Sequence, residues 1–226
     1  MLKFYYHPQS PLARRVWIAL LEKEISFIPI IINLKDGEQF KPDFLRLNPF
    51  HHIPVIVDDG LRVLESLAIL DYLECKYPNH SLLPQDASRL ATVRMVQMVA
   101  NNELSSLVIP LIAETEDSPK LLLAKRKIKR ILKFFEELLA DENYFGGNSL
   151  SLGDIVAGNN IVLIDKLGFE FNRNKKIKAW CDRLMAREVW QKTQPNKQQV
   201  KIFTQTVQQL IKSQGQSQVI YKIKHS

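Results

Sequence analysis

One stretch decides the fold of this chain: Asn48-Pro-Phe-His-His-Ile-Pro-Val-Ile-Val-Asp-Asp-Gly-Leu-Arg-Val-Leu-Glu-Ser66. Two short apolar runs, residues 55–57 and 61–64, flank an Asp-Asp-Gly turn, and this arrangement predicts a β-hairpin. Pro54 stands directly before the first run, where a proline is a candidate for a cis peptide bond in a loop with free backbone groups. A helix is expected to follow the hairpin over residues 66–77.

The start of that helix is the first candidate binding element. Glu65 and Ser66 lie where the N–H groups of the first turn have no partner within a helix, so an anion can bind there. Together with the backbone around Ile53-Pro54, these residues predict a cradle for a small anionic peptide. The alternative is that Glu65 and Ser66 only cap the helix.

The segments before this stretch supply the rest of an α/β domain. Residues 2–6 predict a first strand, and residues 27–32 predict a second strand whose Pro29 favours a sheet edge. Between the two strands, Ser10 is a good N-cap and is followed by a proline and an apolar helical stripe. With a short helix expected over residues 41–47, the order β-α-β-α-β-β-α indicates a sheet with helices on its faces.

Everything after the polar, proline-bearing segment 79–88 has helical periodicity. We therefore expect three parts: an α/β domain over residues 1–78, a linker over 79–88, and an all-α domain over 89–226 that ends in a basic C-terminal extension.

Two local patterns in the helical part carry further expectations. The long helical pattern over residues 88–114 is expected to kink near Pro110. Ser151 and Asp154 form a capping-box variant in front of a helix that is apolar nearly all round, and such a helix should be the core of this domain.

Composition narrows the class of protein. The formal net charge is +7, and no apolar run reaches the ~18 residues that a membrane-spanning helix needs. The first residues lack the basic and apolar regions of a signal peptide. Cys75 and Cys181 lie far apart in helical patterns, which argues for a reducing compartment and against a disulfide scaffold or a metal cluster.

Basic residues concentrate in two places. Residues 120–133 form a basic run on a predicted helix, and residues 197–226 contain five Lys without any Asp or Glu. Such runs can bind nucleic acid, but no nucleic-acid motif accompanies them, and a solvated helix face is the plainer interpretation. An alternative for the C-terminal run is a surface for a membrane or a partner.

Four motifs, taken in order, resemble the cytosolic glutathione transferases. They are Phe4-Tyr-Tyr-His-Pro-Gln-Ser10 with Arg14, Asn48-Pro-x-His-His-Ile-Pro54, Glu65-Ser66-x-Ala68-Ile69-x-x-Tyr72-Leu73, and Ser151-x-x-Asp154. The first motif resembles the serine-type delta and theta classes. The resemblance covers about residues 1–193 and implies a thioredoxin-like N-terminal domain followed by an all-helical domain. It also implies a cytoplasmic homodimer that acts in detoxification without a metal, and we expect neither a nucleic-acid partner nor integral membrane association.

The resemblance implies glutathione as the co-substrate and a hydrophobic electrophile as the second substrate. Ser10 would be catalytic, because its hydroxyl would donate a hydrogen bond to the glutathione sulfur and, with the dipole of the first helix, stabilise the thiolate. A plain N-cap is the alternative role for Ser10. Tyr5 and Tyr6 are rival donors, and at least one of them should lie in the core because strand residues alternate between faces. Arg14 either adds positive potential or is an ordinary exposed helix residue.

The tripeptide itself would be bound by the hairpin stretch. Glu65 and Ser66 would hold the γ-glutamyl group, with the Glu65 carboxylate toward its ammonium. The backbone of Ile53, presented by Pro54, would pair with the extended cysteinyl part as an added strand.

The glycine carboxylate of glutathione needs a cation or a hydrogen-bond donor. His51 is the favoured residue and His52 the second choice. The whole set favours a glutathione transferase. The alternatives are a non-catalytic module that binds glutathione or a partner, and a glutathione-dependent dehalogenase, peroxidase or isomerase, which would use the same activated thiol.

Overall fold

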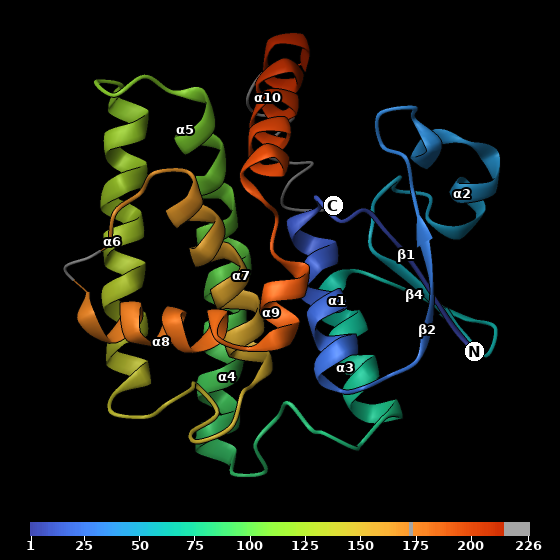
Figure 1. Cartoon of the computed structure of the whole chain (residues 1–226), viewed down its shortest axis with the longest axis horizontal. Coiled ribbons are helices and arrows are strands. Elements are labelled where there is room, and N and C mark those ends of the chain that lie inside the picture. The colour runs from blue at the N-terminus through green and yellow to red at the C-terminus, as the bar shows by residue number, and fades with distance from the viewer. Residues whose placement is uncertain (172–173, 215–226) are drawn as a thin grey trace. The chain divides into compact units, whose positions relative to one another are not determined.

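The computed structural model describes residues 1–171 and 174–214, and the chain divides into two compact units (Figure 1). The first unit comprises Met1–Ser81, and the second begins at Leu82. In the described ranges, no helix combines the length and apolar character needed to cross a bilayer. The end of the expected basic extension, residues 215–226, lies outside the described residues.

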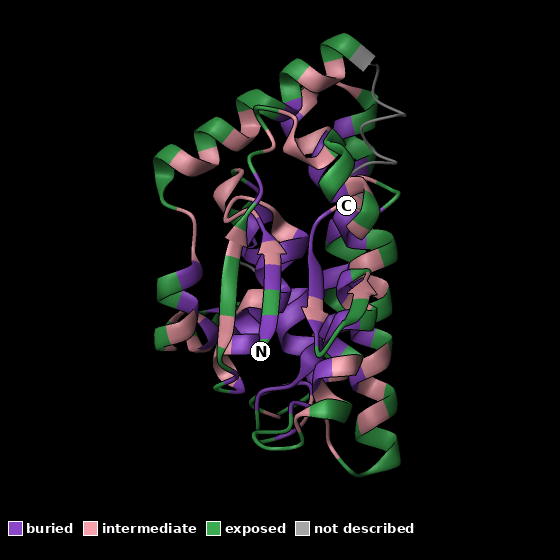
Figure 2. Ribbon diagram, turned by 90° about the vertical axis from the view of Figure 1, so that its right-hand side faces the viewer, coloured by how far each residue is buried: buried purple, intermediate pink, exposed green. Residues whose placement is uncertain are grey.

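A four-stranded mixed sheet forms the centre of the first unit, with the strand order β2-β1-β3-β4. β1 (Leu2–Tyr6) runs parallel to β2 (Phe27–Ile31) and antiparallel to β3 (Val55–Asp58), and β3 forms the expected hairpin with β4 (Leu61–Leu64). β2 is an edge strand, as Pro29 predicts, because proline cannot donate a ladder hydrogen bond. Figure 2 shows that the strands carry both buried and exposed positions.

Helices lie on both faces of this sheet (Figure 1). α1 (Pro11–Glu22) and α3 (Ser66–Lys76) contact each other, and the Trp17 ring of α1 lies 5.4 Å from the Tyr6 ring of β1. The other face is covered by a short helix, α2 (Pro42–Leu47), which the 3-10 turn η1 (Glu38–Phe40) precedes. On the α2 side, a separate core cluster contains Ile32, Phe44, Ile53 and Val55.

The second unit is all-helical in its described residues. Its helices are α4 (Ala87–Val99), α5 (Val108–Ala113), α6 (Pro119–Leu139), α7 (Leu152–Lys166), α8 (Lys175–Met185), α9 (Glu188–Thr193) and α10 (Lys197–Gln214). Every residue from Leu152 to Ile164 is buried, so α7 is the core helix that its all-round apolar sequence predicts. The two units together confirm the predicted class, a thioredoxin-like α/β domain followed by an all-α domain.

The prediction of a kink near Pro110 is wrong about the position of the helix interruption. The interruption lies before Pro110, in a π-helical segment (Ala100–Leu104) and a 3-10 turn (Ser105–Leu107) that separate α4 from α5. The Ala100 carbonyl accepts hydrogen bonds from Ser105 Oγ at 3.0 Å and from Asn160 Nδ2 of α7 at 3.1 Å. Pro110 lies in the first turn of α5, where a missing N–H leaves no hydrogen bond broken.

The capping box at the start of α7 is confirmed and is part of a larger buried network. The Ser151 N–H donates to Asp154 Oδ2 at 2.8 Å, and the Ser151 hydroxyl accepts from the Asp154 amide. Asp154 Oδ1 also accepts from the Trp180 indole at 2.8 Å and from the Phe145 amide at 3.0 Å. Burial raises the pKa of Asp154 to about 6, although these hydrogen bonds act in the opposite direction. The carboxyl therefore ties the start of α7 to α8 and to the preceding loop.

Candidate active site

The sheet register brings the expected site loops to one end of the first unit. Tyr5 pairs with Val55, and Val55 pairs with Leu64, so the end of β1, the start of β3 and the end of β4 lie side by side. The loop that carries Ser10 follows β1, the Ile53-Pro54 bond precedes β3, and Ser66 follows β4. β2 ends at the same level, because Ile31 pairs with Tyr6. The loops that carry Ser10, Pro54 and Ser66 are far apart in the sequence but therefore lie at the same end of the sheet.

Ser10 is the N-cap of α1, as its sequence context predicts. Its backbone is extended, with φ −75° and ψ 117°, and its Oγ accepts a hydrogen bond from the Ala13 amide at 3.2 Å. A serine hydroxyl has one hydrogen to donate in addition to its acceptor lone pairs. The capping bond therefore leaves that hydrogen available to another group at the positive end of a 12-residue helix.

The turn before Ser10 is held by a residue that sequence reasoning missed. His7 Nδ1 accepts a hydrogen bond from the Gln9 amide at 3.2 Å, and the His7 carbonyl accepts from the Ser10 amide at 2.9 Å. Burial lowers the pKa of His7, which favours the neutral ring that can accept at Nδ1. A histidine followed by proline in a turn gave no specific signal of this role.

The two tyrosines of β1 point to opposite faces, as strand alternation predicts. Tyr6 is 6% exposed, and its ring stacks on Phe4 with the centroids 4.5 Å apart. Burial raises the pKa of Tyr6. Tyr5 is packed against the cluster on the α2 side. Both rings are therefore part of the packing of the sheet, whereas Ser10 lies in the loop at its end.

Arg14 is not the ordinary exposed helix residue that the sequence allows. Arg14 and Arg15 of α1 are both buried, at 3% and 1% exposure. Burial lowers the pKa of Arg14 to about 10 and that of Arg15 to about 9, and the Glu65 carboxylate acts against the shift of Arg15. Sequence reasoning did not select Arg15, because adjacent arginines on a helix usually face solvent. The positive potential of α1 thus comes from inside the unit.

Asn48 organises the loop that leads to β3. Its buried side chain donates from Nδ2 to the His52 carbonyl at 2.7 Å and accepts at Oδ1 from the Phe50 amide at 2.9 Å. Its carbonyl accepts from the His51 amide at 3.1 Å, and His51 has a left-handed φ of 62°. The motif contained Asn48, but its three-way role depends on loop geometry that the sequence does not show.

The Ile53-Pro54 peptide bond is cis, as expected. Ile53 is 3% exposed, and its side chain belongs to the α2-side cluster. Within the described ranges, the backbone N–H and C=O of Ile53 make no hydrogen bond to other backbone groups. This backbone can therefore accept an extended peptide as an additional strand.

His51 offers a buried polar atom for a ligand. Its ring lies 5.1 Å from the Phe40 ring, and its Nδ1 atom is buried with no hydrogen-bond partner among the described residues. Gln39 Oε1, next to Phe40 in the chain, is also buried without a hydrogen-bond partner among the described residues. The half-buried His52 contributes its carbonyl to the Asn48 bond. Because buried polar groups usually have partners, these atoms are candidates for ligand contacts.

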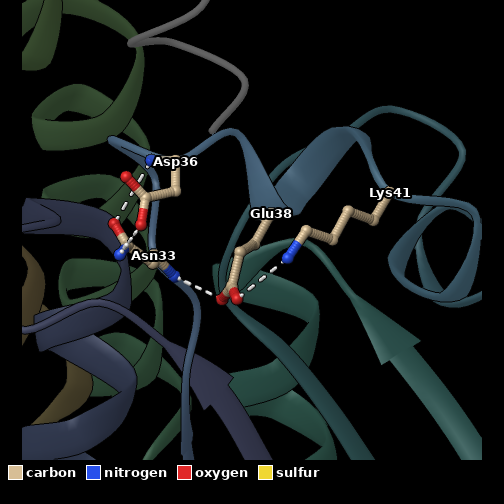
Figure 3. A network of polar contacts seen from close by, with 4 residues as sticks. All are labelled: Asn33, Asp36, Glu38 and Lys41. Atoms are coloured by element: carbon tan, nitrogen blue, oxygen red, sulfur yellow. Dashed lines mark hydrogen bonds and ion pairs between the residues drawn. The ribbon is translucent and has the colours of Figure 1, made fainter.

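The loop that supports Phe40 is held by its own polar network (Figure 3). Glu38 accepts from the Asn33 amide at 2.8 Å and from Lys41 Nζ at 3.3 Å, and these two donors hold the pKa of Glu38 below its usual value. Asn33 also donates to Asp36 at 2.7 Å. The sequence gave no signal of this network, because it depends on turns inside a polar loop.

Glu65 and Ser66 lie at the start of α3. Glu65 has a φ of 64°, its carboxylate is exposed, and its side chain makes no capping hydrogen bond. Its carbonyl accepts from the Ile69 amide at 2.8 Å. Ser66 is the first helical residue and is 6% exposed. The Glu65 side chain therefore does not cap the helix, and the first turn can offer its amides to an anion.

Comparison with known families identifies this architecture. The model of the glutathione S-transferase N-terminal domain matches residues 9–76, and the model of the C-terminal domain of the same family matches residues 98–188. The chain belongs to the glutathione S-transferase family. The N-terminal match contains Ser10 and the glutathione-site candidates of the two later loops, His51, His52, Ile53, Pro54, Glu65 and Ser66.

Two related glutathione S-transferases match along nearly their whole length, and a third matches over about half of its length. A glutathione S-transferase of Hyoscyamus muticus is 27% identical over 210 residues, which is 87% of this chain and 99% of the relative. The tobacco (Nicotiana tabacum) protein PARB is 28% identical over 204 residues, 84% of this chain and 96% of the relative. A zeta-class enzyme of Euphorbia esula is 41% identical over 110 residues, but this covers only 49% of this chain and 47% of the relative.

Solved structures of the family share the fold. A glutathione transferase of Bombyx mori superposes with a TM-score of 0.78 at 25% identity, covering 90% of this chain and 96% of that one. A delta-class enzyme of Nilaparvata lugens superposes with a TM-score of 0.77 at 24% identity, covering 93% and 100%. Among the described residues, no group of three His, Cys, Asp or Glu side chains could hold a metal ion.

Proposed function

We propose that this protein is a glutathione transferase that activates the thiol of glutathione for attack on hydrophobic electrophiles. The observation that carries this proposal is the match to both domains of the glutathione S-transferase family. The geometry of the first unit supports it, because the loops bearing Ser10, Ile53 and Ser66 meet at one end of the sheet.

Thiol activation is assigned to Ser10. A free thiol has a pKa of about 8.5 and is mostly protonated at neutral pH. The Ser10 hydroxyl donates its hydrogen to the sulfur, the dipole of α1 adds positive potential, and the thiol proton is released to solvent. The thiolate then forms a bond to an electrophilic carbon, and the leaving group departs with its electron pair.

The γ-glutamyl and cysteinyl parts are assigned to α3 and to the cis-proline loop. The γ-glutamyl carboxylate binds at the first turn of α3, next to Ser66, and the exposed Glu65 carboxylate faces the ammonium group. The cysteinyl part pairs with the backbone of Ile53, whose N–H and C=O have no backbone partner in the described residues. Pro54 fixes the direction of this backbone.

The glycine carboxylate is assigned to His51. Its buried Nδ1 atom, which has no partner among the described residues, supports this choice. His52 is the second choice, and its carbonyl is already engaged by Asn48.

Three wider proposals go with this function, the first resting on Ser10 at the start of α1 and the others on family membership. The protein is a serine-type enzyme, works as a homodimer, and detoxifies electrophiles in the cytoplasm without a resident metal, nucleic-acid partner or membrane-spanning segment. Met95 and Met98, which are 43% and 47% exposed on α4, offer apolar surface for self-association. The molar mass in solution, measured by light scattering at several concentrations, tests the dimer.

One experiment tests the proposed function. The full chain is passed over immobilised glutathione, eluted with free glutathione, and assayed for conjugation of a generic aryl halide. Retention with turnover is expected. Retention without turnover would show that the protein binds glutathione but does not catalyse conjugation. Loss of both retention and turnover would overturn the proposal.

A further inference from the structure

α6 carries a basic surface that the glutathione chemistry does not use. Six cationic side chains define this surface, and we call it the α6 basic face: Lys125, Arg126, Lys127, Lys129, Arg130 and Lys133. All are exposed except Lys125, which is half-buried. The opposite side of α6 contacts α4, α5 and α8, and the helix lies at the outer edge of its unit (Figure 1). The cations are therefore held facing outward.

Few acidic groups neutralise the α6 basic face. The helix contains no Asp or Glu before Glu136. Lys133 pairs with Glu137 at 3.9 Å, and the other five cations have no carboxylate within ion-pair distance in residues 1–171 and 174–214. The preceding loop carries acids at positions 114, 116 and 117, at the far N-terminal end of the helix. The middle of α6 thus keeps an uncompensated positive charge.

Two exposed leucines share this side of the helix. Leu122 is 45% exposed and Leu123 is 51% exposed. Residues four apart on a helix are neighbours on its surface, so Leu122 lies beside Arg126 and Leu123 beside Lys127. The outward side of α6 therefore combines two apolar side chains with a row of cations, and these are the two kinds of group that attach a protein to an anionic membrane surface.

We propose that the α6 basic face docks the protein on the surface of a bilayer that contains anionic phospholipids. The cations meet the lipid phosphates, and Leu122 and Leu123 enter the boundary between headgroups and acyl chains. Nucleic acid would satisfy the cations but would leave the leucines without an apolar partner. A second copy of the chain, placed on this face around a twofold axis, would set cations against cations.

Vesicle sedimentation with the full chain tests this docking. The chain is expected to sediment with vesicles of phosphatidylcholine and phosphatidylserine, to remain in solution with phosphatidylcholine alone, and to be released by high salt, which screens the charges. The test variant is Arg126→Gln, Lys129→Gln and Arg130→Gln, which keeps good helix formers at exposed positions. Each cation near an anionic surface strengthens binding about fivefold, so partitioning should fall on the order of 100-fold.

A matched control removes the same charge elsewhere. Lys3→Gln, Lys175→Gln and Lys201→Gln change three exposed, scattered lysines, and partitioning should change much less than in the test variant. The variant Leu122→Ser with Leu123→Ser should weaken binding but keep its salt dependence. Circular dichroism confirms that each variant is folded.

Four results would overturn the proposal. The first two are no sedimentation with either vesicle and equal sedimentation with both. The third is an equal loss of vesicle binding in the test and control variants. The fourth is tighter binding of a DNA duplex than of anionic vesicles, with the same dependence on Arg126, Lys129 and Arg130. The last result would assign the face to nucleic acid instead.

Discussion

Replacing Ser10 with alanine is expected to raise the pKa of the bound glutathione thiol and to slow conjugation. The Ser10 hydroxyl already accepts the Ala13 amide, which leaves its hydrogen for the sulfur. A hydrogen bond to a charged group contributes about 1.5–3 kcal/mol, and one pKa unit corresponds to about 1.4 kcal/mol. The thiol pKa should therefore rise by about 1–2 units, and kcat/KM below that pKa should fall about 10- to 100-fold.

The same substitution also removes a helix cap, so a control must separate the two effects. Ser118 is the N-cap of α6, and its Oγ accepts from the Lys120 amide at 3.2 Å. Ser118→Ala should lose a similar cap stability, about 1 kcal/mol, without changing the thiol pKa. Ser10→Thr keeps a hydroxyl and should recover part of the activity.

The assay is the pH dependence of kcat/KM for an aryl halide at limiting glutathione. Ser10→Ala should displace the apparent pKa upward, and Ser118→Ala should leave it in place. An unchanged pH profile and rate in Ser10→Ala would refute the assignment and transfer the role to another donor.

Three further substitutions test other parts of the structure. Asn48→Ala removes two hydrogen bonds, to the His52 carbonyl and from the Phe50 amide, which are worth about 1 kcal/mol each. KM for glutathione should therefore rise by up to about 30-fold, whereas an unchanged KM would show that the loop keeps its conformation without Asn48. Asp154→Ala leaves the buried Trp180 indole and two backbone amides without their acceptor. The free energy of unfolding, measured by urea titration, should fall by about 3–5 kcal/mol, and a loss below about 1 kcal/mol would contradict the role of this network. The Tyr72 hydroxyl, which donates to the buried Asp58 at 2.9 Å, has its pKa raised to about 12 by burial and by that carboxylate. Because the unfolded tyrosine ionises first, stability should decline from about pH 10 to 12, and Tyr72→Phe should make this decline shallower; an identical slope would contradict the assignment.

Most of the fold could be predicted because its signals are local. The hairpin around the Asp-Asp-Gly turn, the N-cap at Ser10 and the capping box at Ser151 each depend on residues within a few positions of one another, and each is present in the structure. The same holds for the all-round burial of α7, which follows from its apolar sequence.

The features that sequence reasoning missed depend on contacts between distant residues. Arg14 and Arg15 are buried only because the rest of the unit surrounds α1. The interruption of α4 lies at Ala100 rather than at Pro110, where Asn160, sixty residues later, donates to the Ala100 carbonyl that the Ser105 amide also binds.

The short helix α9 (Glu188–Thr193) was missed for a different reason, because it has too few residues for a periodic pattern to stand out.

The candidate site also has parts that the sequence could predict and parts that it could not. Its motifs could be located from the sequence, and the sheet register shows why they meet at one end of the first unit. The roles of Ser10, His51 and Ser66 toward glutathione stay predictions. The supporting bonds from His7, Asn48 and Glu38 could not be foreseen, because they join side chains to backbone groups whose positions are set by loop conformation.

The most direct test of the central claim is a spectroscopic titration of the binary complex. The thiolate absorbance of glutathione bound to the unmodified protein is followed against pH and compared with that of free glutathione. The account predicts that the pKa of the bound thiol lies about 1–2 units below the free value of about 8.5. A bound thiol that titrates at the free value would contradict it.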